Sequence, residues 1–367
     1  MRISVAMATY NGERFIREQL DSLAAQTRPP DELVVTDDGS TDRTLQILDD
    51  FSRNAPFPLK IHRNASRLGW SDNFLRAISL CDGTWLALCD QDDVWSPTKL
   101  ATVQSHIDNN SADPDVVLWV HSAQVTDELL SPSKIRYPDI RRGRVVFGRQ
   151  FPIWWSFPGF ALVFRADLAA LACQFAACRG PDPTDPSILL AHDRYIFQLA
   201  KIIGAVGMLS DNLSFYRRHG TTTTSTFCGG NHHVEASMRM SSLIKHAVHV
   251  GESESYCRHS TTARNLADIC HRSALDSAFL RWRGRLFRAE AEYIAYADWL
   301  AARARIYSEP SARRRLRLFW CAVRRPGYIK FYGASWTRGI LALLKDGVVA
   351  LPGADRLHGV MFREDKE

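Results

Sequence analysis

The chain has 367 residues, of which 46% are hydrophobic and 23% are charged. These values are ordinary for a globular protein with one large domain or two smaller ones, and they exclude a largely disordered or collagen-like chain. No stretch approaches the roughly 20 apolar residues that a membrane-spanning helix requires. The net charge of +6 is unevenly placed, because residues 281–325 alone hold twelve arginines against four acids.

The eight cysteines are spread along the chain without a Cys-x-x-Cys pair. A structural zinc cluster is therefore not expected, and the thiols are predicted to be reduced core residues, which favours a cytoplasmic location. The apolar residues at the N-terminus give way to polar ones at Thr9. We interpret them as a buried first strand, because the apolar run is too short for a signal peptide.

Strand and helix signals alternate over the first 130 residues. Helices are expected where apolar residues recur every three or four positions, and strands in the short apolar runs between them. The expected strands are residues 3–8, 33–35, 59–61 and 85–88, and the expected helices are residues 13–26, 41–51, 72–80 and one that starts at 96–97. Such alternation predicts an α/β fold with a Rossmann-like, mostly parallel sheet covered by helices.

Strand signals continue at residues 116–120, 160–164 and 214–217, with a helix at 188–203. They stop near residue 234, and the rest of the chain is typical of helices. We therefore predict an α/β domain over residues 1–230 and a helical, Arg- and aromatic-rich region over residues 231–367.

Polar clusters follow the first, second and fourth expected strands, at the ends where parallel sheets bind ligands. They read TYNG at residues 9–12, DDGSTD at 37–42 and DQDDVW at 90–95. Neither Gly-x-Gly-x-x-Gly nor a P-loop signature is present, which disfavours a dinucleotide fold and a phosphate-cradling loop. Acidic residues beside a phosphate require a cation between them, and carboxylate oxygens suit Mg²⁺ or Mn²⁺.

In this order and at these strand ends, the three motifs resemble those of the family 2 glycosyltransferases of the GT-A fold, over roughly residues 1–225. The resemblance implies an inverting, metal-dependent enzyme with a UDP- or dTDP-linked sugar donor and Mn²⁺ or Mg²⁺. Residues 10–23 look most like bacterial transferases that build surface polysaccharides, rhamnosyltransferases among them. The implied acceptor is a hydroxyl of a saccharide or of a lipid-linked molecule.

The resemblance also assigns donor-binding roles residue by residue. Tyr10 is similar to the residue that packs on the nucleotide base, and Asp38 to the carboxylate that bonds the pyrimidine N–H. Arg217 or Arg218, in the turn after a strand, is expected to bind diphosphate oxygens. The implied donor-binding residues are Thr9, Tyr10, Asn11, Asp38, Asn64, Asn73, Asp90, Trp155, Gly159 and Arg217.

Metal and catalytic roles fall on four further residues. Asp92 and Asp93, together with His219, resemble the metal ligands of the family, and the choice of inner ligand between the two acids stays open. Asp193 resembles the base that accepts the proton of the acceptor hydroxyl. The family commonly has Glu-Asp at this position, whereas this chain has His192 before Asp193, so His192 is an alternative base.

Two other functions compete with a transferase. A sugar nucleotidyltransferase is one, although the Gly-rich basic first loop that it would show is absent. A non-catalytic nucleotide-sugar-binding protein of the same fold is the other, and the intact acids oppose it. The arginine-rich tail is expected to contact an anionic membrane rather than nucleic acid, which implies a peripheral location at the inner face of the membrane, and the alternative is that its arginines face water.

Overall fold

The computed structural model describes residues 1–110, 115–151, 153, 155–182, 189–220, 252–324, 327, 331 and 336–351. The chain divides into two compact units. The first comprises Met1–Arg149, Trp155–Ala176 and Ala191–Gly229, and the second comprises Gln150–Trp154, Ala177–Leu190 and Gly230–Glu367. The sequence predicted one boundary at residue 230, whereas two short segments before that point group with the helical unit.

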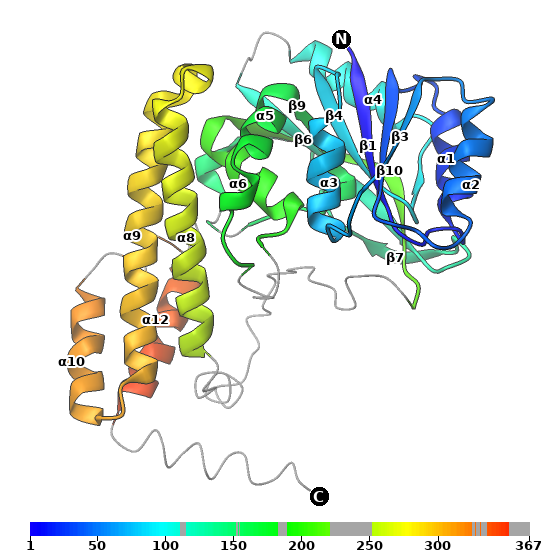
Figure 1. The fold of residues 1–367 in the computed structure, drawn as a ribbon. Coiled ribbons are helices and arrows are strands. Elements are labelled where there is room, and N and C mark those ends of the chain that lie inside the picture. Colours follow the sequence, from blue (N-terminus) through cyan, green and yellow to red (C-terminus); the bar gives the residue numbers. More distant parts are fainter. Residues whose placement is uncertain are drawn as a thin grey trace, which may run out of the picture. The chain divides into compact units, whose positions relative to one another are not determined.

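A ten-stranded sheet forms the centre of the first unit, as Figure 1 shows. Its main path runs in the order β3-β2-β1-β4-β9-β6-β10-β5, while β7 pairs with β6 and β8 pairs with β10. The strands are β1 (Ile3–Thr9), β2 (Glu32–Asp37), β3 (Leu59–Arg63), β4 (Trp85–Asp90), β5 (Val94–Trp95), β6 (Val116–Thr126), β7 (Pro132–Arg136), β8 (Arg144–Phe147), β9 (Leu162–Arg165) and β10 (Ala205–Arg217).

The sheet is parallel in its N-terminal half and mixed beyond it. β1 pairs in parallel with β2 and β4, and β2 pairs in parallel with β3, as the alternating sequence pattern predicted. β9 then enters between β4 and β6 and runs antiparallel to both. A buried apolar run has the same pattern in either direction, so the sequence did not reveal this reversal.

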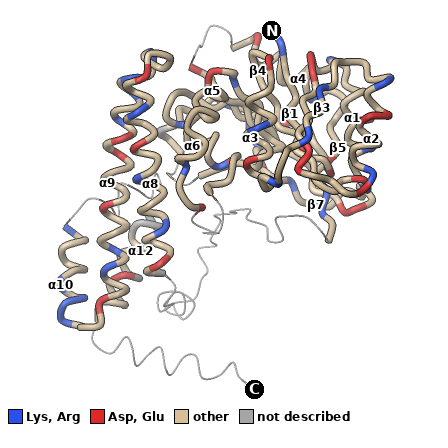
Figure 2. The backbone as a smooth tube through the Cα atoms, viewed as in Figure 1, with Lys and Arg blue, Asp and Glu red and all other residues tan. Residues whose placement is uncertain are grey.

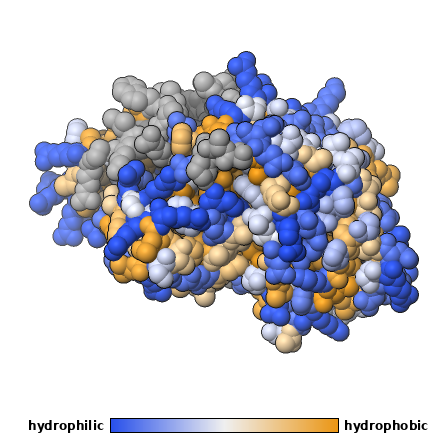
Figure 3. All heavy atoms as spheres, turned by 90° about the horizontal axis from the view of Figure 1, so that it is seen from above, coloured by the Kyte–Doolittle hydropathy of each residue, from blue (hydrophilic) through white to orange (hydrophobic). Residues whose placement is uncertain are grey.

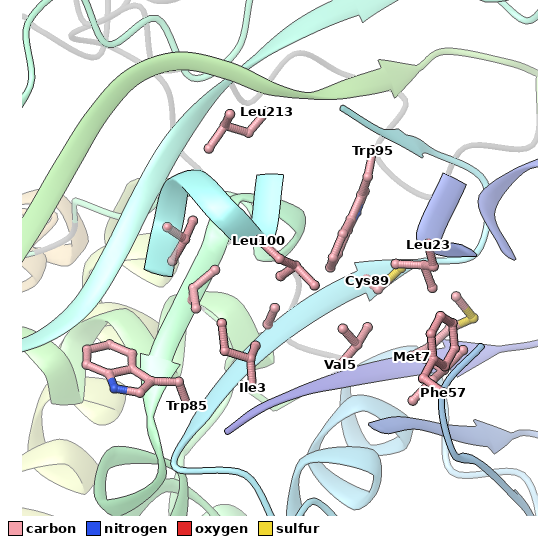
Figure 4. Packing of buried hydrophobic residues seen from close by; sticks show 14 of the residues in the cluster. Ile3, Val5, Met7, Leu23, Phe57, Trp85, Cys89, Trp95, Leu100 and Leu213 are labelled. Carbon is pink, nitrogen blue, oxygen red and sulfur yellow. The ribbon is translucent and has the colours of Figure 1, made fainter. Parts of the chain in front are cut away.

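Helices cover both faces of the sheet. They are α1 (Ile16–Ala24), α2 (Thr44–Ser52), α3 (Trp70–Ser79), α4 (Lys99–Asn109), α5 (Ala166–Gln174) and α6 (His192–Ile203). On one face, alternate β1 residues Ile3, Val5 and Met7 pack in a buried cluster with side chains of α1, α2 and α4, part of which Figure 4 shows. In α1, the residues Ile16, Leu20 and Leu23 are buried, which is the helical spacing expected from the sequence.

The second unit is helical in its described part. Its elements are α8 (Glu252–Leu275), the short 3₁₀ helix η4 (Ser277–Trp282), α9 (Arg283–Ser308), α10 (Ala312–Val323) and α12 (Trp336–Ala350). α8 and α9 form an antiparallel hairpin (Figure 1), in which the Ser260 hydroxyl donates to the Ala297 carbonyl and His271 lies beside Glu290. None of the described helices is long and apolar enough to cross a membrane.

The cysteines only partly follow the prediction that they are core residues. The seven that lie in the described part of the chain are free thiols. Cys89 and Cys270 are buried, whereas Cys257 and Cys321 are exposed on helices of the second unit. The prediction was wrong for those two because a thiol is small enough to sit on either face of an amphipathic helix. Cys228 lies outside the described residues.

Candidate active site

The polar motifs after β1, β2 and β4 lie side by side at one edge of the sheet. β1 pairs with β2 so that Thr9 lies opposite Asp37, and with β4 so that Ala8 lies opposite Asp90. The Thr9 hydroxyl donates to Oδ2 of Asp37 at 3.0 Å. Because the strands are parallel, the residues that follow each of them emerge together. The register therefore gathers the three motifs that the sequence singled out.

The turns after β1 and β2 are tied to each other. Oδ1 of Asp37 accepts hydrogen bonds from the N–H groups of Gly39 and Ser40, at 3.1 and 2.8 Å. Gly39 has φ +87°, a left-handed conformation that favours glycine. Oδ1 of Asn11 accepts from the Thr41 N–H at 2.9 Å. Asp37 and Asn11 therefore fix the shape of this edge through local bonds.

Asp38, Asn64 and Asn73 form a buried polar network that shapes the loop before α3. Oδ1 of Asp38 accepts from the Asn64 amide at 2.9 Å and from the Leu68 N–H at 2.7 Å, and its Oδ2 accepts from the Gly69 N–H at 2.8 Å. The Asn64 amide also donates to Oδ1 of Asn73 at 2.8 Å. Asp38 is only 3% exposed. It therefore holds the loop, and its contact with a nucleotide base stays a prediction.

Tyr10 is the exposed aromatic residue of this edge. The Arg67 guanidinium lies 4.0 Å from the centre of its ring, a cation–π contact. The Gln91 side chain forms two hydrogen bonds to the main chain of Tyr10. Oε1 of Gln91 accepts the Tyr10 N–H at 3.0 Å, and Nε2 of Gln91 donates to the Tyr10 carbonyl at 3.1 Å. A Cβ on Gly12 would lie 2.3 Å from the Gln91 amide oxygen. The sequence analysis did not identify Gln91 as a site residue. The available signal was its position between Asp90 and Asp92 in the third motif.

The two acids proposed as metal ligands differ in exposure. Asp92 is partly exposed, and its Oδ2 lies 2.9 Å from Nε2 of His219. Asp93 is fully buried, and its Oδ1 accepts the Arg217 N–H at 2.9 Å. Burial and the neighbouring Asp92 and Asp90 carboxylates raise the pKa of Asp93 well above its usual range. The geometry therefore favours Asp92 over Asp93 as a ligand.

The donor set at Asp92 fits a small divalent cation that keeps most of its ligands outside the protein. In the described part of the chain, no group of three or more His, Cys, Asp or Glu side chains is arranged to hold a metal ion. Mg²⁺ characteristically takes one or two carboxylates and completes its shell with water and phosphate oxygens. Asp92 supplies one such carboxylate, with the His219 imidazole beside it, and among the described residues no site made only of protein groups is present there.

Arg217 is enclosed by the protein rather than presented to a ligand. Its Nε donates to the Asp92 carbonyl at 2.8 Å, and its two terminal nitrogens donate to the Glu128 carbonyl and to the Glu18 carboxylate at 2.6 and 2.5 Å. Its guanidinium carbon also lies 4.6 Å from the Phe15 ring centre. The side chain is 2% exposed. In contrast to the predicted diphosphate contact, Arg217 positions the loop that carries Asp92.

Asp193 lies near strand β4, which ends at Asp90, although the two acids are far apart in sequence, because a Cβ on Gly159 would be 3.5 Å from Leu88 of β4 and 3.6 Å from Cβ of Asp193. Burial, followed by the charges of Asp92 and Asp193, raises the pKa of Asp90 to about 8. Asp193 lies in the first turn of α6, where its Oδ1 accepts the Arg194 N–H at 2.7 Å. The fold therefore brings the predicted base to the acids that follow β4.

His192 belongs to the packing beneath the site. It is 4% exposed, and its ring stacks on Phe74 with 4.3 Å between ring centres and meets Trp70 edge-on at 5.5 Å. A Cβ on Gly159 would lie 3.1 Å from Nε2 of His192 and 3.6 Å from Cβ of Asp193. A side chain at position 159 would therefore crowd the His192 ring. Of the two candidate bases, Asp193 is the more accessible.

Trp155 lies on the segment that leads to Gly159. Its carbonyl accepts a hydrogen bond from the Gln198 side chain on α6 at 3.2 Å, and its ring meets that of Phe157 edge-on at 6.2 Å. The ring is neither fully buried nor fully exposed. These contacts attach the segment to α6, and a contact between the Trp155 ring and a donor sugar stays a prediction.

Lys99 is a buried cation beneath the acids that sequence reasoning did not identify. Its Nζ donates to the Phe160 carbonyl at 2.9 Å and to the Ser214 hydroxyl at 3.1 Å, and it lies 3.5 Å from the Trp95 ring centre. Burial lowers the pKa of Lys99 to about 7, against an opposing effect of Asp93 and other acidic groups. Lys99 thus joins β5, β10 and the residue after Gly159.

Comparisons with known proteins show which family and fold the chain resembles. Residues 4–171 match the family described as glycosyl transferase family 2. The uncharacterized protein Rv1520 of Mycobacterium tuberculosis is 29% identical over 229 residues, which are 59% of this chain and 59% of that protein, so this chain spans less than two thirds of the relative's length. The dTDP-rhamnosyl transferase RfbG of Shigella flexneri is 37% identical over 98 residues, 26% of this chain and 34% of that protein.

A solved structure extends the likeness to the whole fold. TarS 1–349 of S. aureus, in complex with UDP-GlcNAc, superposes with a TM-score of 0.55 at 18% identity, over 98% of this chain and 92% of that one. At this identity the likeness concerns the fold alone. The sequence match assigns residues 4–171 to glycosyltransferase family 2, and the likeness to TarS shows an α/β fold of the GT-A type.

Proposed function

We propose that the protein transfers a sugar from a nucleotide-sugar donor to a hydroxyl group of an acceptor. The observation that carries the proposal is the meeting of two acidic sites from distant parts of the chain. A Cβ on Gly159 would lie 3.5 Å from Leu88 of β4 and 3.6 Å from Cβ of Asp193 on α6, so the start of α6 lies near the strand that ends at Asp90, and the raised pKa of Asp90 is consistent with this. The acids at the end of β4 suit a cation that binds a diphosphate, and Asp193 suits the role of a general base.

The donor is proposed to be UDP- or dTDP-linked. The exposed Tyr10 ring provides a flat face for a pyrimidine, and the Asp38 network fixes the loop beside it. Two similar proteins are consistent with this class, since RfbG is named for a dTDP-linked sugar and the TarS structure holds UDP-GlcNAc. Thr9, Asn11 and Asn73 then act as positioning residues at the same edge.

We propose that Asp92 and His219 hold Mn²⁺ or Mg²⁺ together with oxygens of the donor diphosphate. A bound cation would neutralise the negative charge that develops on the leaving diphosphate. Arg217 keeps the Asp92 main chain in place through the bond from Nε. Asp93 is assigned to the support of this loop, because its carboxylate is buried against the Arg217 N–H.

The proposed reaction inverts the anomeric centre in a single displacement. Asp193 accepts the proton of the acceptor hydroxyl while its oxygen forms a bond to the anomeric carbon. The bond from that carbon to the diphosphate oxygen breaks on the opposite side, and the nucleoside diphosphate leaves with the electron pair. The support for this role is the accessibility of Asp193 and its proximity to Gly159.

A saccharide or lipid-linked acceptor in bacterial surface polysaccharide synthesis is the proposed destination of the sugar. The support is the likeness to RfbG, which is named as a rhamnosyl transferase. We also propose that the protein works in the cytoplasm, because the seven described cysteines are free thiols and reduced thiols are typical of that compartment. Cell fractionation tests the location directly.

The test is to incubate the protein with UDP-, dTDP- and GDP-sugars, with and without Mn²⁺, and to follow the release of nucleoside diphosphate. The proposal predicts release from a pyrimidine-linked sugar, which rises when a saccharide acceptor is added and falls in Asp92→Asn. Asp93→Asn is the matched control, and it is expected to keep metal-dependent donor binding measured by calorimetry.

Two outcomes would favour the alternatives. Pyrophosphate release from a nucleoside triphosphate and a sugar phosphate would identify a nucleotidyltransferase. Tight donor binding without turnover under any acceptor would identify a non-catalytic binding protein.

A further inference from the structure

The exposed side chains of α10 gather on one face of the helix. Arg313, Arg317, Trp320 and Arg324 are exposed and recur at intervals of four, three and four residues, which places them in one stripe. Trp320 is 56% exposed, whereas Arg315 on the opposite side is buried. The helix contains no acidic residue, and Figure 2 shows basic positions at both ends of it.

α12 carries an apolar stripe with the same spacing. Ile340, Leu344 and Leu351, the last just beyond the end of the helix, are 41%, 56% and 52% exposed. The opposite face packs inside the unit, since Ala342 and Asp346 are buried there. Among the α12 residues whose burial the structure describes, the buried ones are thus small or acidic, and these three large apolar side chains are exposed to solvent.

The two stripes adjoin each other through Phe319. Gly347 lies in the stripe of α12, and a Cβ added there would approach the Phe319 ring to 3.3 Å. The Phe319 ring contacts that of Trp320 with 5.7 Å between ring centres. Phe319 therefore contacts α12 at Gly347 and Trp320 on α10. We call the set of Arg313, Arg317, Trp320, Ile340 and Leu344 the α10–α12 surface.

The α10–α12 surface differs from ordinary exposed apolar residues. Figure 3 shows apolar side chains scattered among hydrophilic ones over one face of the molecule, and isolated ones need no explanation. Here large apolar residues form a row, and they are flanked by arginines and a tryptophan without an acid on α10. Long basic side chains around an apolar strip suit the boundary between lipid headgroups and acyl chains.

We propose that the α10–α12 surface docks on a bilayer that contains anionic lipids. The arginines of α10 bind headgroup phosphates, and Trp320, Ile340 and Leu344 enter the apolar boundary below them. A second copy of the chain fits this surface less well, because a symmetric contact would bring arginines against arginines. The inference does not depend on the proposed transferase activity.

The structure narrows the surface that the sequence suggested. Trp282 and Trp299 are 5% and 2% exposed, so they belong to the core of the helical unit. Arg303 is 2% exposed and pairs with a buried carboxylate. The number of positive charges in residues 281–325 therefore overstates the charge that a membrane would meet.

The test is flotation of the full chain with vesicles of phosphatidylcholine alone or with about 30% phosphatidylglycerol, at low salt and at about 0.5 M salt. Binding is expected to the anionic vesicles and to weaken as salt rises. Each arginine at such a surface is worth about 1 kcal/mol, so Arg313→Gln with Arg317→Gln should weaken binding about 30-fold. Ile340→Gln with Leu344→Gln should also release the protein from the vesicles.

Matched controls change the same residue types elsewhere in the helical unit. Arg283→Gln with Arg288→Gln removes two exposed arginines of α9, and Leu275→Gln with Leu280→Gln removes two leucines that are 58% and 51% exposed. Both controls are expected to bind vesicles as the unchanged protein does. Equal losses in the controls, or no binding at low salt, would overturn the proposal. So would dimers in analytical ultracentrifugation that Leu344→Gln dissociates while vesicle binding stays unchanged.

Discussion

Arg217 in the α/β unit and Arg303 in the helical unit are equally buried, each with a side chain that is 2% exposed, but they are satisfied in different ways. Arg217 bonds to two main-chain carbonyls and to the partly exposed carboxylate of Glu18. Arg303 makes two bonds, at 2.6 and 2.8 Å, to the fully buried carboxylate of Asp346. The first arginine holds a loop, and the second joins two helices.

This difference shows that buried charged side chains have different roles in the two units. In the α/β unit, carboxylates accumulate at one sheet edge at a cost that appears in the raised pKa of Asp90 and Asp93. In the helical unit, the buried charge of Arg303 is matched by Asp346, and the Tyr307 hydroxyl adds a bond to Asp346 at 2.8 Å. Substitution of the acids at the sheet edge should therefore impair activity, whereas substitution within the Arg303–Asp346 pair should lower stability.

Asp193→Asn is expected to give the largest effect. Loss of a positioned base lowers turnover by roughly 10²–10⁴, while the asparagine keeps the shape of the side chain. Donor affinity in calorimetry and the urea midpoint should stay nearly constant. The control is His192→Phe, which keeps a ring stacked on Phe74 and should keep turnover. Retained turnover in Asp193→Asn, with loss in His192→Phe, would mean that the base is misassigned.

Asp346→Ala tests how much the buried Arg303–Asp346 ion pair contributes to the stability of the helical unit. It leaves the Arg303 guanidinium buried without its carboxylate, which should lower the free energy of unfolding by about 3–5 kcal/mol. Replacing both partners by apolar residues, Arg303→Met with Asp346→Leu, should restore most of that loss in urea titrations. A double variant as unstable as the single one would show that the pair itself, rather than the uncompensated charge, sets the stability.

Lys99→Met is expected to change how stability depends on pH. The pKa of Lys99 is about 7 in the folded protein and near 10.5 when the chain is unfolded. Between these values the unfolded state binds the extra proton, so Lys99 adds stability as pH rises, by about 1.4 kcal/mol per pH unit. Relative to Lys99→Met, the unchanged protein should therefore gain stability from pH 7 to 10. A constant difference across that range would contradict the buried, titrating lysine.

Gln91→Ala is expected to give the smallest effect. It removes two hydrogen bonds to the Tyr10 main chain, each worth about 1 kcal/mol. Donor affinity should fall by a factor of about ten, because the Tyr10 turn loses its support. Gln46→Ala on the exposed face of α2 is the control and should leave donor affinity unchanged. Equal affinities in both variants would remove Gln91 from the site.

The sequence alone determined the first four strands, their parallel pairing and the meeting of the polar motifs at one edge of the sheet. Periodicity located β1, β2, β3 and β4, and parallel pairing follows from the helices between them. The polar motifs then had to meet, because the ends of parallel strands share an edge. A short motif and the strand before it are determined by residues that are neighbours in the sequence, so the sequence alone predicts both.

Only the tertiary structure decided which of the candidate site residues are buried and which are accessible at this edge of the sheet. Asp92 and Asp93 are the same residue type and neighbours in the sequence. In the structure Asp93 is buried, and its carboxylate accepts the Arg217 N–H. Lys99 and Gln91 became visible only through partners such as Ser214 and Tyr10, which lie far from them in sequence. Burial and pairing are properties of what surrounds a side chain, and those surroundings come from segments that the local pattern does not describe.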